Sequence, residues 1–375
     1  MQRRIYLDNA STTKIHPEVL KTYESLLEKY YANSESLYDE GAEISRMMEK
    51  ARAAIAGLLG IQSDEVIFTG GSSESNSAAI KGVCLAVPEK KHIVTTSIEH
   101  SSIMNACLQM RDLFGYEITF LPVNSEGRVS VEDAIRAIRP DTALVSIMHV
   151  NNEVGSVNPI NEIGEYVKKH SHAYMHSDLT QALGKTDVDL QYIDLASVSA
   201  HKLEGLKGSG LLIRKRHVPM VPLINGGEQE YGYRGGTSNA PANMVFAKTL
   251  RLALERRKNE PEIRAMRDAL RTKLAEIEGI EFNSPADAVA CLLNFSYEKI
   301  PSEVMQNALN RKGFLVSARS TCESKSLNPS YVLQAMGFSE TRASSCIRVS
   351  LSDENTMEEV MAFADAVKEI IQNYG

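Results

Sequence analysis

Short apolar runs alternate with amphipathic stretches along the first two thirds of the chain. Runs of four or five residues between turn signals favour buried strands, and the stretches between them have helical spacing. The strands are predicted at residues 66–69, 92–95, 117–120, 143–147, 173–176 and 195–199, with helices expected from Glu74 and Ser101. This alternation is typical of a mainly parallel sheet, which binds ligands beyond the carboxyl ends of its strands.

The pattern changes after about residue 241. The next predicted elements are a long helix at 243–277, strands at 280–282 and 288–295, a helix at 301–311 and a final helix from about 355. We therefore expect an α/β protein with a large domain at 15–255. Residues 1–14 and 256–375 are expected to form a smaller α+β domain. Within it, the polar, serine-rich residues 317–330 predict an exposed, mobile loop.

Composition excludes several classes of protein. The 375 residues carry a net charge of -7 without a long run of Lys or Arg, which disfavours direct nucleic-acid binding. No apolar stretch predicts a signal peptide or a membrane span. The five cysteines are widely spaced and form no Cys-x-x-Cys pair, so neither a disulfide framework nor a metal site is expected. A reducing cytoplasm is the expected compartment.

Lys202 follows the predicted strand at 195–199, in the sequence Ser199-Ala200-His201-Lys202. A lysine at this place can form a Schiff base with an aldehyde cofactor. Taken alone, it is more simply an ordinary surface lysine. The same four residues match the Ser-x-x-Lys motif of serine acyl-enzymes, but the companion Ser-Asp-Asn and Lys-Thr-Gly motifs are absent.

Two other strand ends carry candidate chemistry. Asp178 follows the strand at 173–176, and its carboxylate could keep a pyridine nitrogen protonated or could equally cap a helix. The turn containing Gly71, Ser72 and Ser73 precedes a predicted helix. The free N–H groups at such a helix start can hold a phosphate, although a plain capped helix fits this turn equally well.

The remaining candidates are less specific. His100 could stack on an aromatic cofactor or move protons. Asn152, in the run Asn151-Asn152-Glu153, could belong to a turn or contact a polar substrate. Arg348 lies within an apolar run, so it needs a carboxylate from the protein or from a substrate. Cys322 stands in a polar stretch, where a thiol can react, whereas the other four cysteines lie in apolar contexts and are predicted to belong to the core.

The order and spacing of these motifs resemble the cysteine desulfurases of the NifS/IscS type. This family is a branch of the class V aminotransferase group, with pyridoxal 5'-phosphate (PLP) fold type I. The resemblance covers nearly the whole chain. The matching segments are 6–13, 68–76, 99–100, 146–155, 178–181, 199–202, 234–237, 322, 329–333 and 347–351. The opening from Tyr6 to Thr13 and the Asn-Asn-Glu block at 151–153 are the specific parts.

The resemblance implies PLP as the cofactor and a role for each candidate residue. It makes Lys202 the Schiff-base lysine, Cys322 the nucleophile, and His100 a catalytic residue that also stacks on the ring. Asp178 would pair with the pyridine nitrogen, and Gln181 would bond the phenolic oxygen. The implied phosphate ligands are Ser72, Ser73, Ser199, His201 and, from the partner subunit of a homodimer, Thr237. Asn152 and Arg348 would hold the substrate carboxylate.

The implied reaction converts L-cysteine to L-alanine and leaves the sulfur on Cys322 as a persulfide. The serine-rich segment around Cys322 resembles the long-loop subgroup, which passes sulfur to acceptor proteins for iron–sulfur cluster assembly or tRNA thiolation. One alternative is a related PLP-dependent lyase or aminotransferase that acts on another amino acid, with Cys322 a bystander. A second alternative is a non-catalytic scaffold, which would not need to retain Lys202, Asp178 and Cys322 together.

Several residues depart from the family pattern around the mouth of the expected pocket and in the cysteine loop. They are Tyr38, Glu204, Leu206, Glu228, Tyr231 and Arg319. These departures concern the rate, the sulfur acceptor and the substrate rather than PLP binding.

Overall fold

The computed structural model describes residues 4–318 and 328–374, and its centre is a seven-stranded sheet in the order β2-β8-β7-β6-β5-β3-β4. The strands are β2 (Val66–Thr69), β3 (His92–Thr96), β4 (Glu117–Leu121), β5 (Thr142–Ser146), β6 (Tyr174–Asp178), β7 (Leu195–Ser199) and β8 (Gly210–Arg214). Strand β8 is antiparallel to both neighbours, whereas the pairs from β7 through β4 are parallel. The predicted mainly parallel α/β sheet is confirmed.

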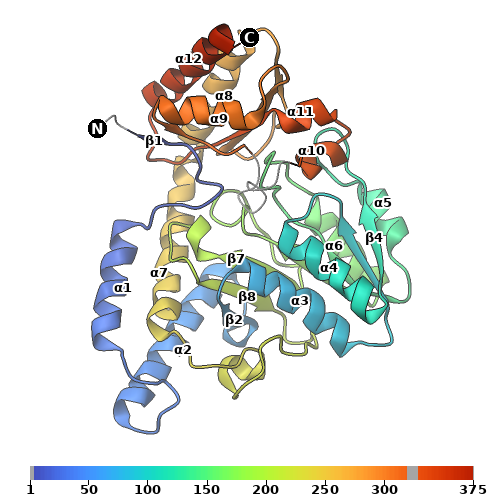
Figure 1. Cartoon of the computed structure of the whole chain (residues 1–375). Helices are drawn as coiled ribbons and strands as arrows, with labels where there is room; N and C mark the ends of the chain where they lie inside the picture. Colours follow the sequence, from blue (N-terminus) through green and yellow to red (C-terminus); the bar gives the residue numbers. More distant parts are fainter. Residues whose placement is uncertain (1–3, 319–327, 375) are drawn as a thin grey trace.

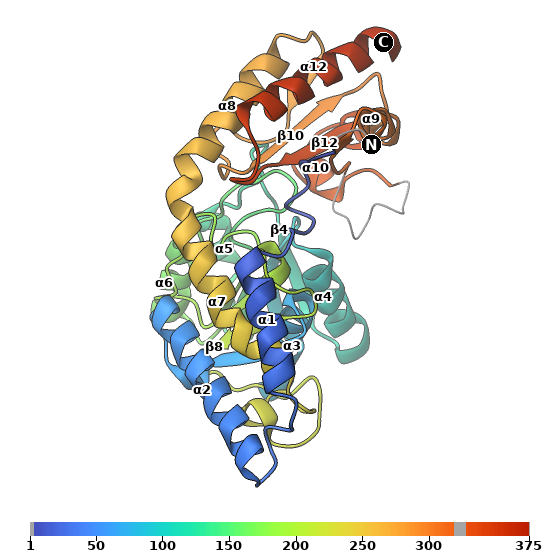
Figure 2. The ribbon, with the colours of Figure 1, turned by 90° about the vertical axis from the view of Figure 1, so that its left-hand side faces the viewer.

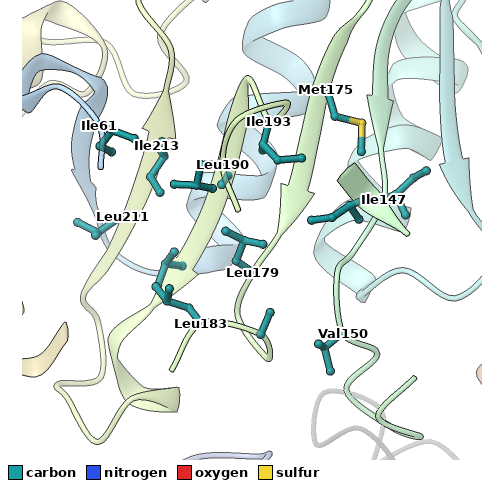
Figure 3. Close-up of a cluster of buried hydrophobic side chains, with 14 of the residues drawn as sticks. Ile61, Ile147, Val150, Met175, Leu179, Leu183, Leu190, Ile193, Leu211 and Ile213 are labelled. Atoms are coloured by element: carbon teal, nitrogen blue, oxygen red, sulfur yellow. The ribbon is translucent and has the colours of Figure 1, made fainter. Parts of the chain in front are cut away.

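Helices cover both faces of this sheet (Figure 1). They are α2 (Asp39–Leu59), α3 (Ser72–Ala86), α4 (Ser101–Phe114), α5 (Val131–Ala137), α6 (Ile160–His170) and α7 (Ala240–Arg256). Helix α1 (Pro17–Lys29) packs against α7 instead. Successive strand residues point to opposite faces. Ile67 therefore packs with the core that includes Ile80 of α3, while Val66 packs with the core that includes Ile55 of α2. Figure 3 shows part of the core to which Val66 and Ile55 belong.

A smaller set of elements lies at one end of the molecule, together with both chain termini (Figure 1). Its strands are β1 (Ile5–Tyr6), β9 (Ile280–Phe282), β10 (Leu292–Tyr297), β11 (Phe314–Leu315) and β12 (Cys346–Ser350), and its helices are α8 (Glu260–Ala275), α9 (Ser302–Arg311), α10 (Tyr331–Ala335), α11 (Glu340–Ser344) and α12 (Met357–Tyr374). Strand β1 pairs with β11, and β12-β10-β9 form an antiparallel sheet. These elements share a separate hydrophobic core.

Helices α7 and α8 are consecutive and connect the two groups of elements (Figure 2). The single helix predicted over 243–277 is therefore wrong. A 3-10 turn at Arg257–Asn259 separates the two helices. Pro261 lies in the first turn of α8, where its missing N–H has no cost, whereas inside one continuous helix it would remove a hydrogen bond. The predicted domain boundary at 255/256 falls beside this turn, and the two-domain division remains a prediction.

The strand predicted at 288–295 is wrong over its first half, because β10 begins only at Leu292. The N–H of Ala288 bonds the carbonyl of Pro285 in a turn, and the N–H of Val289 bonds the carbonyl of Gly155. These backbone groups are therefore satisfied outside the sheet. Apolar side chains alone do not distinguish such a buried turn from a strand.

Three smaller predictions also need correction. Helix α3 begins at Ser72 rather than at Glu74, directly after Gly71. Strand β6 covers Tyr174–Asp178 rather than 173–176, since Asp178 still pairs with β7. Cys291 is only partly buried, unlike Cys84, Cys107 and Cys346, because it lies beside a small cavity.

The described residues contain neither a membrane-spanning helix nor a cluster of metal-binding side chains. No helix among them has the length and apolar character required to cross a membrane. No group of three or more His, Cys, Asp or Glu side chains in the same residues could hold a metal ion.

Candidate active site

A cavity of about 250 Å³ lies where the N-terminal segment meets the start of α3 and the ends of β6 and β7. This is the place expected for a ligand in such a sheet. The predicted site residues that line the cavity are Ser72, Ser73, His100, Asn152, Asp178, Gln181, His201, Lys202 and Arg348. Sequence segments that are far apart are thus brought together as predicted, while the role of each residue remains a prediction.

Lys202 ends a short 3-10 turn, Ala200–Lys202, that directly follows β7. Its Nζ donates to the carbonyl oxygens of Ala10 and Ser11, both at 2.6 Å. Ala10 and Ser11 belong to the segment after β1 and line the same cavity. The N-terminal segment therefore holds the lysine amine at the cavity wall.

Asp178 is the last residue of β6 and is almost fully buried. Its Oδ2 accepts a hydrogen bond from Nδ2 of Asn76 at 2.8 Å, and its Oδ1 accepts one from the N–H of Thr180 at 2.9 Å. These hydrogen bonds to both oxygens fix the orientation of the carboxylate. The arrangement therefore provides a fixed negative charge at the cavity.

The same Asn76 connects Asp178 to His100. Nδ2 of Asn76 also donates to Oγ of Ser102 at 2.9 Å, and this oxygen lies 2.8 Å from Nδ1 of His100. Nδ1 of His100 accepts from the N–H of Ser102, so the ring caps α4 through this nitrogen. An accepting Nδ1 carries no proton, which places the proton of the neutral ring on Nε2.

The imidazoles of the cavity are held neutral. Burial is the main cause that lowers the pKa of His100; the charge of Asp178 opposes this shift, and that of Lys202 adds to it. For His201, burial together with Lys202, Lys207 and Lys185 lowers the pKa to about 4. Both rings are therefore expected to act as neutral groups near pH 7.

The start of α3 provides a place for an anion. The residue before this helix is a glycine, so it has no side chain to cap the helix, and Ser72 and Ser73 of the first turn line the cavity. Its N-cap is Gly71, with φ of 142°, and a Cβ on Gly210 would lie only 2.5 Å from the Cα of Gly71. Two glycines are thus required for β8 to pack against this turn. The uncapped N–H groups and the helix dipole favour a bound phosphate.

Two of the predicted phosphate ligands do not line this cavity. Ser199 is buried at the end of β7, and its Oγ lies 3.6 Å from the position of a Cβ on Gly71. It is thus next to the start of α3. Thr237 is exposed and lines a different cavity, together with Gly70, Gly208 and Arg234. The prediction that Thr237 serves a partner subunit is not tested by a single chain.

Arg348 lies on β12 with only 1% of its surface exposed. Its Nη1 donates to the carbonyl of Asn152 at 2.8 Å, and its Nη2 contacts Asp8 Oδ1 at 3.1 Å and Ser11 Oγ at 2.6 Å. Asp8 is thus the protein carboxylate that this arginine needs. Nε of Arg348 and Oδ1 of Asn152 are buried without a hydrogen-bond partner among the described residues. Both side chains can therefore bind a further polar group.

Cys322 lies outside the described residues, as does Arg319. The chain on either side is anchored beside the cavity. Oγ of Ser317 lies 3.1 Å from Oγ of Ser11, and Oγ of Ser330 donates to Glu153 at 2.6 Å. Of these partners, Ser11 lines the cavity, and Glu153 follows Asn152, which also lines it.

Three residues near the cavity were not identified from the sequence. Asn76 and Ser102 form the connection between Asp178 and His100 described above. Glu99 is fully buried, and burial raises the pKa of its carboxyl to about 8. Its Oε1 accepts from the N–H of Met148 and from Thr96, both at 2.8 Å. Only the position of Asn76 and Ser102 at helix starts could have indicated their role.

The comparison with known families decides the classification. The class V aminotransferase family matches residues 5–363 of the chain. This chain belongs to that family. Within it, the chain is 40% identical to the "NifS/IcsS protein homolog" of Lactobacillus delbrueckii subsp. bulgaricus, over 99% of this chain and 98% of the relative. It is 37% identical to "Cysteine desulfurase IscS" of Methanosarcina thermophila, over 99% and 92% of the two chains.

Solved structures of family members have the same fold. A "NIFS-LIKE PROTEIN" superposes with a TM-score of 0.92 at 33% identity and covers 99% of this chain and 100% of its own. A structure titled "SspA in complex with cysteine" superposes with a TM-score of 0.82 at 33% identity, over 92% and 98% of the two chains. This class V member is thus NifS/IscS-like and has PLP fold type I, an α/β fold with a mainly parallel central sheet.

Proposed function

We propose that this chain binds PLP in the cavity at Lys202 and acts as a cysteine desulfurase. It converts L-cysteine to L-alanine and carries the sulfur on Cys322 as a persulfide. The observation that carries the proposal is the convergence of Lys202, Asp178, His100 and the uncapped start of α3 on one cavity. The cysteine desulfurases among the relatives of this chain support the same activity.

The residues present fit PLP. The uncapped N–H groups of α3 would bind its phosphate with Ser72, Ser73, Ser199 and His201. The carboxylate of Asp178 would face the pyridine nitrogen and keep it protonated, while Nε2 of Gln181 would donate to the phenolic oxygen. Bound PLP supplies an electron-withdrawing ring, which stabilises negative charge at the α-carbon of the substrate. His100 would stack on this ring as a neutral imidazole.

Arg348 and Asn152 would bind the substrate carboxylate. The guanidinium of Arg348 is buried, so a carboxylate placed beside it gains a charge-assisted hydrogen bond away from water. The two unpartnered atoms of these side chains, Nε of Arg348 and Oδ1 of Asn152, mark the place where a ligand completes the polar contacts. This contact would orient the amino acid with its α-carbon toward Lys202, which would move the α-proton.

The sulfur step uses the thiolate of Cys322 as the nucleophile. It attacks the substrate sulfur, so one S–S bond forms and the C–S bond breaks. The electrons of the C–S bond remain with the carbon, which takes up a proton and leaves as L-alanine. The contact of Ser317 with Ser11, which lines the cavity, supports this role.

A homodimer would complete the phosphate site with Thr237 of the partner subunit. Thr237 is exposed and does not line the cavity of its own chain. Apolar side chains of the preceding residues are also partly exposed, namely Val221, Leu223, Ile224 and Tyr231. Such side chains favour burial against a second copy.

The persulfide would pass to an acceptor protein for iron–sulfur cluster assembly or tRNA thiolation. We place this reaction in the cytoplasm, where a reactive thiol stays reduced. The four cysteines of the described residues are all free, which agrees with a reducing compartment.

Replacing Cys322 by alanine tests the proposed activity. The variant should keep the visible absorbance of bound PLP but form alanine from L-cysteine at least about a thousandfold more slowly, because the nucleophile is gone. Alanine and sulfide are measured in the presence of dithiothreitol. Ser324→Ala, two residues away, is the matched control and should retain full activity. Undiminished alanine formation by Cys322→Ala would instead support a PLP lyase or aminotransferase that does not need this thiol.

A further inference from the structure

The side-chain amide of Gln181 is held from two sides. Its Nε2 donates to the carbonyl oxygen of Ala10 at 2.9 Å, and its Oε1 accepts from Nζ of Lys185 at 2.5 Å. Gln181 is 5% exposed and lines the cavity of Lys202. Lys185 lies one helical turn further along, within the turn that follows β6. No role for Lys185 is implied by the reaction described above.

The donors and acceptors around this amide fix its orientation. A carbonyl oxygen only accepts hydrogen bonds, and a lysine ammonium only donates them. Oε1 must therefore face Lys185, and Nε2 must face Ala10. The carbonyl of Ala10 already accepts from Nζ of Lys202 at 2.6 Å, so its two lone pairs are both used. The second N–H of Gln181 is then left for a ligand in the cavity.

Lys185 reaches the amide from outside the active cavity. It lines a second, smaller cavity of about 80 Å³, whose wall also includes Lys202, Glu204, Arg256 and Cys291. Lys202 thus separates the two cavities, and Lys185 does not line the larger one. Lys185 is therefore not placed to contact a ligand in the larger cavity directly.

We propose that Lys185 is a positioning residue: by donating to Oε1 of Gln181, it holds the amide nitrogen toward the cavity, where Nε2 bonds an anionic oxygen of the cofactor. This inference rests on the proposed binding of PLP. Burial and, to a smaller extent, Arg348 lower the pKa of Lys185, whereas Cys291 raises it. The carbonyl oxygen of Ala10 holds Nε2 on its own side in either protonation state of Lys185, so Oε1 remains the atom that faces the lysine amine.

The test measures how the visible absorbance of the PLP-loaded protein changes with pH. An N–H donor stabilises negative charge on the phenolic oxygen and so disfavours protonation of the neighbouring nitrogen that joins Lys202 to the cofactor. Loss of the donor should therefore raise the pH midpoint. The other titratable and charged groups around Gln181 and Lys185 are kept unchanged. They are His100, Asp178, His201, Lys202, Glu204, Arg256, Cys291 and Arg348.

The variants Lys185→Met and Gln181→Met should each raise the midpoint by about one pH unit, the shift expected for one hydrogen bond to a charged group. The double variant should show no larger shift than Gln181→Met, because both changes remove the same hydrogen bond. Lys185→Arg keeps a donor and should restore most of the wild-type midpoint. Lys169→Met, an exposed lysine on α6, should leave it unchanged.

Three outcomes would contradict the inference in different ways. An unchanged midpoint in Lys185→Met, in protein that still forms the visible band, would show that Lys185 does not position Gln181. If Lys185→Met shifted the pH midpoint equally in the wild type and in the Gln181→Met variant, the charge of Lys185 would act on the cofactor directly rather than through Gln181. Wild-type protein without a visible band would contradict the proposed function itself, and this inference with it.

Discussion

The Lys202→Ala variant is expected to fold and to lose its covalent link to PLP. After desalting, it should lack the visible absorbance of the wild-type protein. Its rate of alanine formation should fall at least about a thousandfold, because one side chain supplies both the attachment and the proton transfer. Absorbance spectra and alanine assays at equal protein concentration measure both effects.

The control for this prediction is Lys168→Ala, which removes an exposed lysine on α6. It should match the wild type in colour and in rate. Nζ of Lys202 donates to the carbonyls of Ala10 and Ser11, which lie outside helices and strands, so the variant should also keep its secondary structure. A Lys202→Ala protein that retains covalently bound PLP and normal activity would contradict the assignment of this lysine.

Replacing Glu230 by alanine should cause a large loss of stability. Glu230 and Arg52 form a buried ion pair, with side chains that are 4% and 3% exposed and a shortest N–O distance of 2.7 Å. Glu230 also accepts from the N–H of Phe68 on β2, at 2.8 Å. Alanine would remove the buried carboxylate and leave this buried guanidinium with only the exposed carboxylate of Glu49, which costs about 3–5 kcal/mol of unfolding free energy. Urea denaturation at fixed protein concentration measures the change.

Glu49 provides a matched control for this ion pair. It bonds the same Arg52 at 3.0 Å, but its side chain is 51% exposed. Glu49→Ala should therefore cost no more than about 1 kcal/mol. Glu230→Gln keeps the hydrogen-bond acceptor without the charge and should lie between the two. Equal unfolding free energies for Glu230→Ala and Glu49→Ala would show that the buried ion pair stabilises the protein no more than the exposed one.

The ion pair also has a consequence for the site. Glu230 and Tyr231 adopt positive φ angles of 49° and 57°, which residues other than glycine rarely do. The same segment continues to Arg234, whose Nε contacts Glu74 of α3 at 3.0 Å, and then to Thr237. The pair with Arg52 therefore helps to hold this strained segment against the start of α3. Loss of PLP affinity in Glu230→Ala would be consistent with this connection.

The sequence predicted the framework of the fold well. The inner strands β5 and β7 were recognisable because strands buried on both faces are short, mainly apolar runs, whereas β4 lies at the sheet edge and is only partly buried. The strand-end positions of Asp178 and Lys202 followed from the same pattern. The break at Arg257–Asn259 was missed, because Glu, Arg and Lys residues that favour a helix continue across it and only Pro261 indicates the second start.

The contacts within the site were less predictable. Arg348 was expected to need a carboxylate, but its partner Asp8 is 340 residues away in the sequence. The connection from Asp178 through Asn76 and Ser102 to His100 joins three separate elements. Periodicity specifies which face of an element is buried, but it does not specify which polar side chains meet across elements. Lys185 remained unrecognised for the same reason.

The central claim is that sulfur from L-cysteine is transferred to Cys322. The most direct measurement is mass spectrometry of the peptide containing Cys322, after PLP-loaded protein is incubated with L-cysteine in the absence of reductant. The proposal predicts a gain of one sulfur atom on Cys322, reversed by dithiothreitol and accompanied by release of alanine. Protein that holds PLP but shows neither added sulfur nor alanine would contradict the account.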